Sequence, residues 1–201
     1  MEKPPFIFIG NHFASDFVNT RKNVKGIRTE LLNNFESLVL WLQETDRLAL
    51  LEGDPLSLSQ LDQQKILNKI LAIREKLENY MEEIINEKKL PDFILEDLNK
   101  QLLHYQSHLQ INQELSVLKI VRKYSVNNLP GLFLDEIAHF MTSISPAKLK
   151  KCKNPACILY FYDNSKNQQR QWCSMDKCGN RIKVNNHYHR MKKIEQEAEL
   201  H

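Results

Sequence analysis

The chain has 201 residues, of which 42% are hydrophobic and 26% are charged, a composition typical of globular proteins. Its formal net charge is +3, and the cysteine-free stretch 1–151 is long enough to bury a hydrophobic core. No apolar run approaches the roughly 20 residues of a membrane-spanning helix, so we expect no membrane partner.

The first ten residues contain a short apolar stretch and a single lysine. They lack the longer apolar region and the small-residue cleavage site of a signal peptide. We therefore expect a cytoplasmic protein. Thiols stay reduced in that compartment, so its cysteines are expected to be metal ligands rather than disulfide partners.

Residues 1–146 are predicted to form a mainly helical domain. A short helix is expected over residues 12–19, and a second helix follows Asn34, whose side chain suits an N-cap. The clearest helix follows Ser59, because apolar residues recur there at intervals of three and four. The positions of this apolar stripe are Ile66, Ile70, Ile73, Leu77, Met81 and Ile84.

The rest of this domain is predicted to add two helices and one small β-hairpin. One helix begins at Pro91, and the β-branched side chains of residues 108–124 favour the hairpin. The last helix is expected over residues 130–144. The domain then ends at Pro146, and the short linker predicts contact with the segment 147–201 that follows.

Four polar residues near the N-terminus form a candidate site. His12, Asp16, Asn19 and Arg21 lie in an otherwise apolar segment, and His12 and Asp16 have the spacing of one helix face. One interpretation is a pocket for a small-molecule effector. The other, which we favour, is a buried hydrogen-bonded network that anchors the N-terminal helix.

The four cysteines are spaced C-x4-C-x15-C-x4-C. Two equally spaced pairs of thiolates supply the tetrahedral geometry that Zn²⁺ prefers. Four thiolates leave no open position for water, so we predict one structural, non-catalytic Zn²⁺. Its ligands are Cys152, Cys157, Cys173 and Cys178. The alternative is two buried or redox-active cysteine pairs.

The residues around the cysteines predict a treble-clef-like zinc finger over residues 147–201. A β-prone run at 158–162 and a turn at 163–165 favour the order knuckle, β-hairpin, knuckle, helix. Asn180 is the expected N-cap of that helix, and Gly179 is expected to adopt a left-handed conformation. A module this small depends on its metal for much of its folding energy.

Positive charge is concentrated in this module. Residues 148–193 are rich in lysine and arginine and contain only two acidic residues, which predicts an anionic partner, DNA first. The candidate DNA contacts are Lys166, Arg170, Lys177, Arg181, Lys183, His187 and Arg190. The alternative is a solvated or protein-binding face. A separate stripe of Val184, Tyr188 and Met191 is expected to pack on the hairpin.

Several short motifs are shared with known families. The cysteine segment contains Cys152-Lys153-Asn154-Pro155-Ala156-Cys157, Asp163-Asn164-Ser165, Arg170, Trp172-Cys173-Ser174-Met175 and Cys178-Gly179-Asn180-Arg181. In these motifs it resembles the CGNR zinc finger. The segment Gly10 to Thr20 resembles the opening of the ABATE domain, which is associated with stress-induced transcription regulators.

The resemblance implies a bacterial, cytoplasmic, zinc-containing DNA-binding transcription regulator. Its helical domain would sense an effector or form a homodimer, and its basic finger would contact DNA. The alternative function is a protein–protein interaction module with a structural zinc clip. We expect no enzymatic activity, because the sequence has no glycine-rich phosphate loop and no nucleophile motif.

Overall fold

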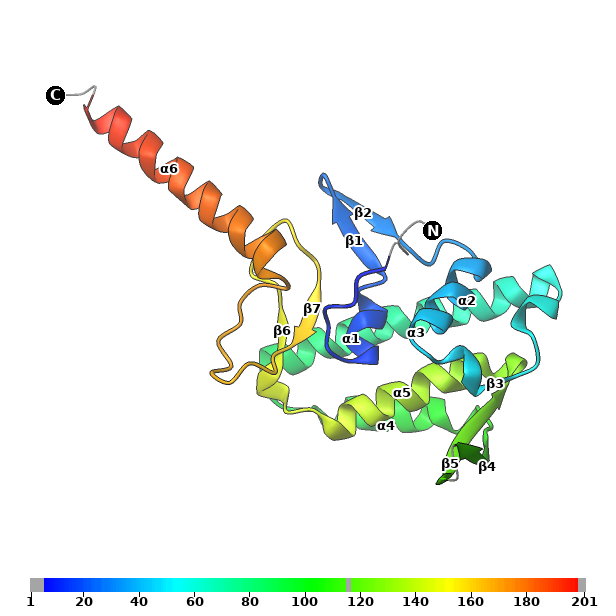
Figure 1. Ribbon diagram of the computed structural model, residues 1–201. Helices are drawn as coiled ribbons and strands as arrows, with labels where there is room; N and C mark the ends of the chain where they lie inside the picture. Colours follow the sequence, from blue (N-terminus) through cyan, green and yellow to red (C-terminus); the bar gives the residue numbers. More distant parts are fainter. Residues whose placement is uncertain (1–5, 115–116, 199–201) are drawn as a thin grey trace.

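The structure is a computed structural model that describes residues 6–114 and 117–198 (Figure 1). Its α-helices are α1 (Phe13–Val18), α2 (Phe35–Glu44), α3 (Gln60–Glu87), α4 (Asp92–Leu102), α5 (Leu129–Ser143) and α6 (Asn180–Ala198). Shorter helical turns span Leu48–Leu50, Pro55–Ser57, Val126–Asn128, Pro146–Lys148 and Met175–Gly179. Within the two described ranges, no helix is both long and apolar enough to cross a membrane.

The strands form small, separate sheets. Their bounds are β1 (Arg21–Val24), β2 (Ile27–Glu30), β3 (Leu51–Glu52), β4 (His108–Glu114), β5 (Val117–Ser125), β6 (Leu149–Lys151) and β7 (Tyr160–Tyr162). β1 pairs with β2, and β6 pairs with β7, both antiparallel. In the third sheet, β5 lies between β3, which is parallel to it, and β4, which is antiparallel.

Local hydrogen bonds set the start of the two helices predicted from N-cap residues. The side chain of Asn34 accepts from the Ser37 backbone N–H at 2.8 Å, and the Ser37 hydroxyl accepts from that of Asn34 at 3.2 Å. This reciprocal pair starts α2 as predicted. The hydroxyl of Ser59 accepts from the backbone N–H of Asp62 at 3.2 Å and starts α3, which ends at Lys88 in a left-handed conformation.

The main core lies between α1, α2, α3 and α5 (Figure 1). Its centre is an aromatic cluster in which the rings of Phe17 and Phe133 are 4.6 Å apart and those of Phe13 and Trp41 are 4.8 Å apart. All six residues of the predicted α3 stripe are buried against it. The charged side chain of Arg74 is also buried, where it donates to the Thr20 hydroxyl and pairs with Glu30.

The N-terminal segment joins the helical part to the cysteine-containing part. Asn19 donates to the Tyr160 carbonyl and accepts from the Tyr160 N–H, both at 2.8 Å. The Tyr162 N–H donates to the Gly10 carbonyl at 2.8 Å, and Asn11 donates to the Tyr162 carbonyl at 2.9 Å. These bonds close the edge of β7 that faces away from β6. The predicted contact between the two parts of the chain is therefore confirmed.

Two features of the sheets differ from the sequence-based prediction. The β4–β5 hairpin was predicted, but the β1–β2 hairpin was not, although Lys25 and Gly26, both with positive φ, form the two-residue turn that such hairpins use. In the finger, the first cysteine pair lies in the loop between β6 and β7, rather than before a hairpin. The segment after β7 forms a compact loop instead of a second strand, because the Asp163 carboxylate accepts hydrogen bonds from the backbone N–H groups of Ser165 and Arg170.

Candidate metal centre

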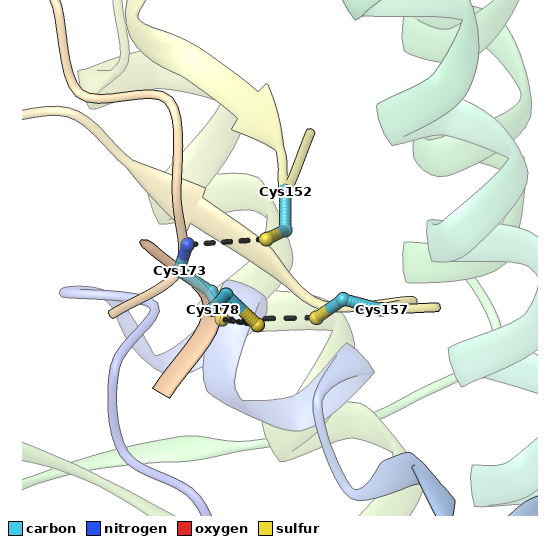
Figure 2. Close-up of side chains that lie close together, drawn as sticks. All are labelled: Cys152, Cys157, Cys173 and Cys178. Carbon is cyan, nitrogen blue, oxygen red and sulfur yellow. Dashed lines mark hydrogen bonds between the residues drawn. The ribbon is translucent and has the colours of Figure 1, made fainter. Parts of the chain in front are cut away.

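The four cysteines converge from two loops that are separated by 15 residues in the sequence (Figure 2). Cys152 directly follows β6 and Cys157 precedes β7, whereas Cys173 and Cys178 lie at the turn that leads into α6. Their four sulfur atoms all lie within 4.8 Å of one another. The Cys157 and Cys173 sulfurs are 3.7 Å apart, and those of Cys173 and Cys178 are 3.5 Å apart.

These separations fit a tetrahedral zinc site. Sulfur atoms that each lie about 2.3 Å from one Zn²⁺ are about 3.8 Å apart, far longer than the ~2.05 Å of a disulfide. All four cysteines are free thiols. Hydrogen bonds between its thiol and the sulfurs of Cys152 and Cys157 raise the pKa of Cys173. Metal binding displaces thiol protons and holds the sulfurs as thiolates, so this donor set suits Zn²⁺.

The first ligand loop is a tight turn built on Asn154. The Asn154 carbonyl accepts from the Cys157 N–H at 2.8 Å, and its side-chain oxygen accepts from the Ala156 N–H at 3.0 Å. Across the site, the backbone N–H of Cys173 donates to the Cys152 sulfur at 3.3 Å. Such hydrogen bonds hold the sulfurs in place and stabilise the thiolate form.

The second ligand loop differs from the prediction in how its helix begins. Ser174 is the N-cap of the turn Met175–Gly179, which runs directly into α6 at Asn180, and its carbonyl accepts from the N–H groups of Cys178 and Gly179 at 3.0 Å. Gly179 is not left-handed. It is a glycine because a β-carbon there would lie 2.3 Å from the Met175 sulfur and 2.8 Å from Cδ1 of Trp172.

Asp163 organises the loop between the two cysteine pairs. Its fully buried carboxylate accepts from the Ser165 N–H and the Arg170 N–H, each at 3.0 Å, and from Lys150 Nζ at 2.6 Å. Burial alone would raise the pKa of Asp163, but these hydrogen bonds outweigh it and lower the pKa to about 2. The carboxylate therefore stays charged and fixes the start of the second ligand loop.

Arg170 has internal contacts, unlike the other predicted DNA-contact residues. Its guanidinium lies 4.2 Å from the Phe161 ring and donates to the carbonyls of Trp172, at 3.0 Å, and Cys173. It also donates to the Ile9 carbonyl at 3.3 Å. These bonds give Arg170 a positioning role beside the cysteines, and they leave its charge turned inward.

The other predicted DNA-contact residues lie on one projecting part of the molecule. α6 extends away from the body beyond the metal centre (Figure 1). Exposed side chains on α6 and on the loops before it are Lys166, Lys177, Arg181, Lys183, His187 and Arg190. The metal centre thus holds the first turn of an exposed, basic helix.

The predicted packing of the apolar α6 stripe on the hairpin is wrong. Val184, Tyr188 and Met191 are 69%, 61% and 44% exposed. The reason is the direction of the helix, which leaves the finger at Gly179 and runs away from β6 and β7 (Figure 1). The stripe therefore faces solvent in this chain.

His12 and Asp16 make contacts with separate parts of the structure. The His12 ring packs on that of Phe140 at 4.6 Å, and burial lowers the pKa of His12. One Asp16 oxygen accepts from the backbone N–H groups of Ile9 and Gly10, at 3.0 and 2.7 Å. The side chains of His12 and Asp16 therefore have different partners.

Asn19 and Arg21 also have structural partners. Asn19 binds the backbone of Tyr160, and Arg21 pairs with Glu78 on α3 at 3.0 Å. The four predicted polar residues thus face different elements, and His12 Nδ1 is buried without a hydrogen-bond partner, so they form neither one hydrogen-bonded network nor a shared pocket.

A cavity that sequence reasoning missed lies beside the cysteines. Its volume is about 180 Å³, and residues of the N-terminal segment, β1 and the metal centre line it. Three cationic side chains line it, those of Lys22, Lys177 and Arg181, together with the apolar side chains of Ile7 and Ile9. Only the folded contact between residues 7–23 and 156–181 brings these residues together, so no local sequence pattern reveals them.

Comparison with known proteins gives one match within this region. No curated protein matches the chain. Residues 148–191, which contain the four cysteines and the first two-thirds of α6, match the CGNR zinc finger family. The match does not extend to the segment that resembles the ABATE domain. The site built from Cys152, Cys157, Cys173 and Cys178 therefore lies inside a segment similar to the CGNR zinc finger.

Proposed function

We propose that this protein is a zinc-containing, non-catalytic DNA-binding transcription regulator. In this proposal Zn²⁺ is structural, α6 contacts DNA, and the helical domain senses an effector or forms a dimer. The observation that carries the proposal is the position of α6, which projects from the body with its basic side chains exposed (Figure 1).

The charge and shape of α6 support this role. Arg181, Lys183 and Arg190 are exposed on the helix, and Lys166 and Lys177 extend the positive surface onto the preceding loops. Phosphate contacts by such side chains supply most of the non-specific affinity for DNA. An α-helix that stands clear of its domain fits the major groove, which is about 12 Å wide.

Fluorescence anisotropy with labelled duplex DNA tests the proposal. We expect binding by the zinc-loaded protein that weakens steeply with salt, because bound phosphates release counterions. Lys183→Ala and Arg190→Ala should each reduce the slope of log K against log salt by about 1. The matched control is Lys69→Ala, which removes an exposed lysine of α3 and should change nothing.

Two results would contradict the DNA proposal. One is the absence of salt-sensitive binding to any duplex in a random-sequence pool. The other is an equal effect of the α6 variants and Lys69→Ala, since this would leave only a general effect of net charge.

A second candidate function has its own supporting observation. The exposed Val184 and Met191 side chains give α6 an apolar stripe beside its basic one. This favours a protein-interaction module in which the zinc centre fixes α6 to the helical body and α6 binds the partner protein. Under this alternative, Val184→Ser and Met191→Ser abolish capture of one stoichiometric protein partner. Lys183→Ala and Arg190→Ala leave that capture intact.

A further inference from the structure

The β4–β5 hairpin presents an apolar face to solvent. Leu109 and Ile111 of β4 are 61% and 71% exposed, and Leu118 and Ile120 of β5 are 68% and 71% exposed. Ile111 lies directly opposite Ile120 in the ladder. Residues that alternate along a strand, and their cross-strand partners, share one face, so the four side chains form a single patch. We name this set the hairpin patch.

The hairpin patch continues a face that is buried at the base of the hairpin. Tyr124 shares this face of β5, is only 4% exposed, and hydrogen bonds to Asp135 of α5. Farther out, the strands extend past the helices, as Figure 1 shows at the lower right. A two-stranded hairpin is marginally stable in water unless its apolar face is covered. The hairpin patch is therefore a core-type surface without a cover in the described part of the chain.

We propose that the hairpin patch binds the same patch of a second copy of this chain, which forms a symmetric dimer. Electrostatics favour a second copy as the occupant. Arg122, which lies on the same face as the patch, is paired with Asp135 at 3.1 Å. Because this charge is balanced within each chain, two identical patches can approach without like-charge repulsion. A charged partner gains nothing from such a surface.

The size of the patch also suits self-association. Four aliphatic side chains that are about two-thirds exposed present on the order of 500 Å² per copy, which is within the range of about 300–600 Å² for the largest apolar patch of a monomer, and such patches are often functional. Two copies would then bury about 1,000 Å², the lower limit for a specific interface. Two hairpins that pack face to face make a two-layer sheet sandwich, which has a spacing of about 10 Å.

The location of the patch separates this inference from the proposed DNA contact. The β4–β5 hairpin and α6 lie at opposite ends of the molecule (Figure 1). A dimer joined through the hairpins leaves both basic helices accessible. The oligomeric state can therefore be tested independently of DNA binding, and either proposal can fail alone.

Sedimentation velocity of the full zinc-loaded chain, over about a hundredfold range of concentration, tests the dimer. We expect a monomer–dimer equilibrium, and we expect Ile111→Lys and Ile120→Lys each to raise its Kd at least tenfold. The matched control is Val117→Lys, because Val117 is 56% exposed on the same hairpin but pairs with Glu114 on the opposite face. This variant should dimerise like the wild type.

Circular dichroism melts of each variant show whether the hairpin still folds, and Leu118→Gln provides a milder change of the same face. A wild-type chain that stays monomeric at every concentration overturns the proposal. So does dimerisation that survives both isoleucine variants or is lost equally in Val117→Lys. A monomer whose hairpin patch is instead occupied by a different protein also overturns it.

Discussion

Asp16 shows how one residue fixes the N-terminal segment. Its carboxylate accepts the backbone N–H groups of Ile9 and Gly10, and so holds the strand-like start of the chain against α1. Gly10 allows this close approach, because a β-carbon there would lie 2.9 Å from the Asp16 backbone nitrogen. Burial nevertheless dominates the electrostatics and raises the pKa of Asp16 to about 6, despite the two hydrogen bonds.

The raised pKa predicts that Asp16 stabilises the fold more in acid. The folded state binds the proton more tightly than the unfolded state, so stability falls as the pH rises through about 6. From about pH 8 to about pH 5, the wild type should gain about 1 kcal/mol relative to Asp16→Asn. Urea unfolding of both proteins across this range measures the difference. Parallel pH profiles would contradict a buried, titrating Asp16.

At the residue scale, the sequence predicted which residues have functional or structural roles better than it predicted which groups they contact. The cysteine spacing predicted all four members of the cluster, because thiolate geometry is a local constraint. Asn19 and Arg170 stood out by type alone. Their roles depend on Tyr160 and on the Cys173 carbonyl, and those contacts exist only after the chain folds.

At the element scale, the turn before α6 depends on the absence of a side chain at Gly179. Gly179→Ala would place its new carbon against the Met175 sulfur and the Trp172 ring. Overpacking of this kind costs about 1–3 kcal/mol. We expect a lower melting temperature and weaker Zn²⁺ affinity, measured by competition with a chromophoric chelator. The exposed Met175 can be shortened, so Met175→Ala should partly rescue Gly179→Ala. A single variant with wild-type zinc affinity would show that the turn can relax.

Helices were easier to predict than the arrangement of strands and faces. The apolar residues from Ile66 to Ile84 recur with a helical period, which is a local signal, and the structure has α3 at this position. The α6 stripe has the same kind of period, but the sequence carries no signal for the direction in which the helix leaves the finger. β6 was missed because its three residues precede Cys152 and form a strand only through pairing with β7.

At the scale of the whole molecule, the β6–β7 sheet of the finger contributes to the core of the helical body, and the four cysteines lie in a separate cluster with Leu159 and Phe161. Leu149 of β6 and Tyr160 of β7 are buried in the same cluster as the α1 and α5 aromatic residues. The Tyr160 hydroxyl also reaches Glu82 on α3. Any loss of order in the finger therefore removes contacts from the helical part as well.

Removal of zinc should accordingly destabilise the whole chain. We expect chelation to lower the single unfolding transition by about 10 °C or more, since several kcal/mol of metal binding are lost. Differential scanning calorimetry measures this, and Cys152→Ser/Cys173→Ser should reproduce it without chelator. Two separate transitions, with the helical one unmoved, would show instead that the parts fold independently.

The closed edge of β7 sets an order for folding during synthesis. Gly10, Asn11 and Asn19 are made first, yet the backbone groups that they satisfy belong to Tyr160 and Tyr162, more than a hundred residues later. Until β7 has been synthesised, the groups of Gly10, Asn11 and Asn19 that bind it can hydrogen bond only to water or to other parts of the chain. Contacts between distant parts of a chain form slowly, because a long loop must close first. The contact between residues 10–19 and β7 thus forms late, and a ribosome-bound chain that stops before β7 cannot make it.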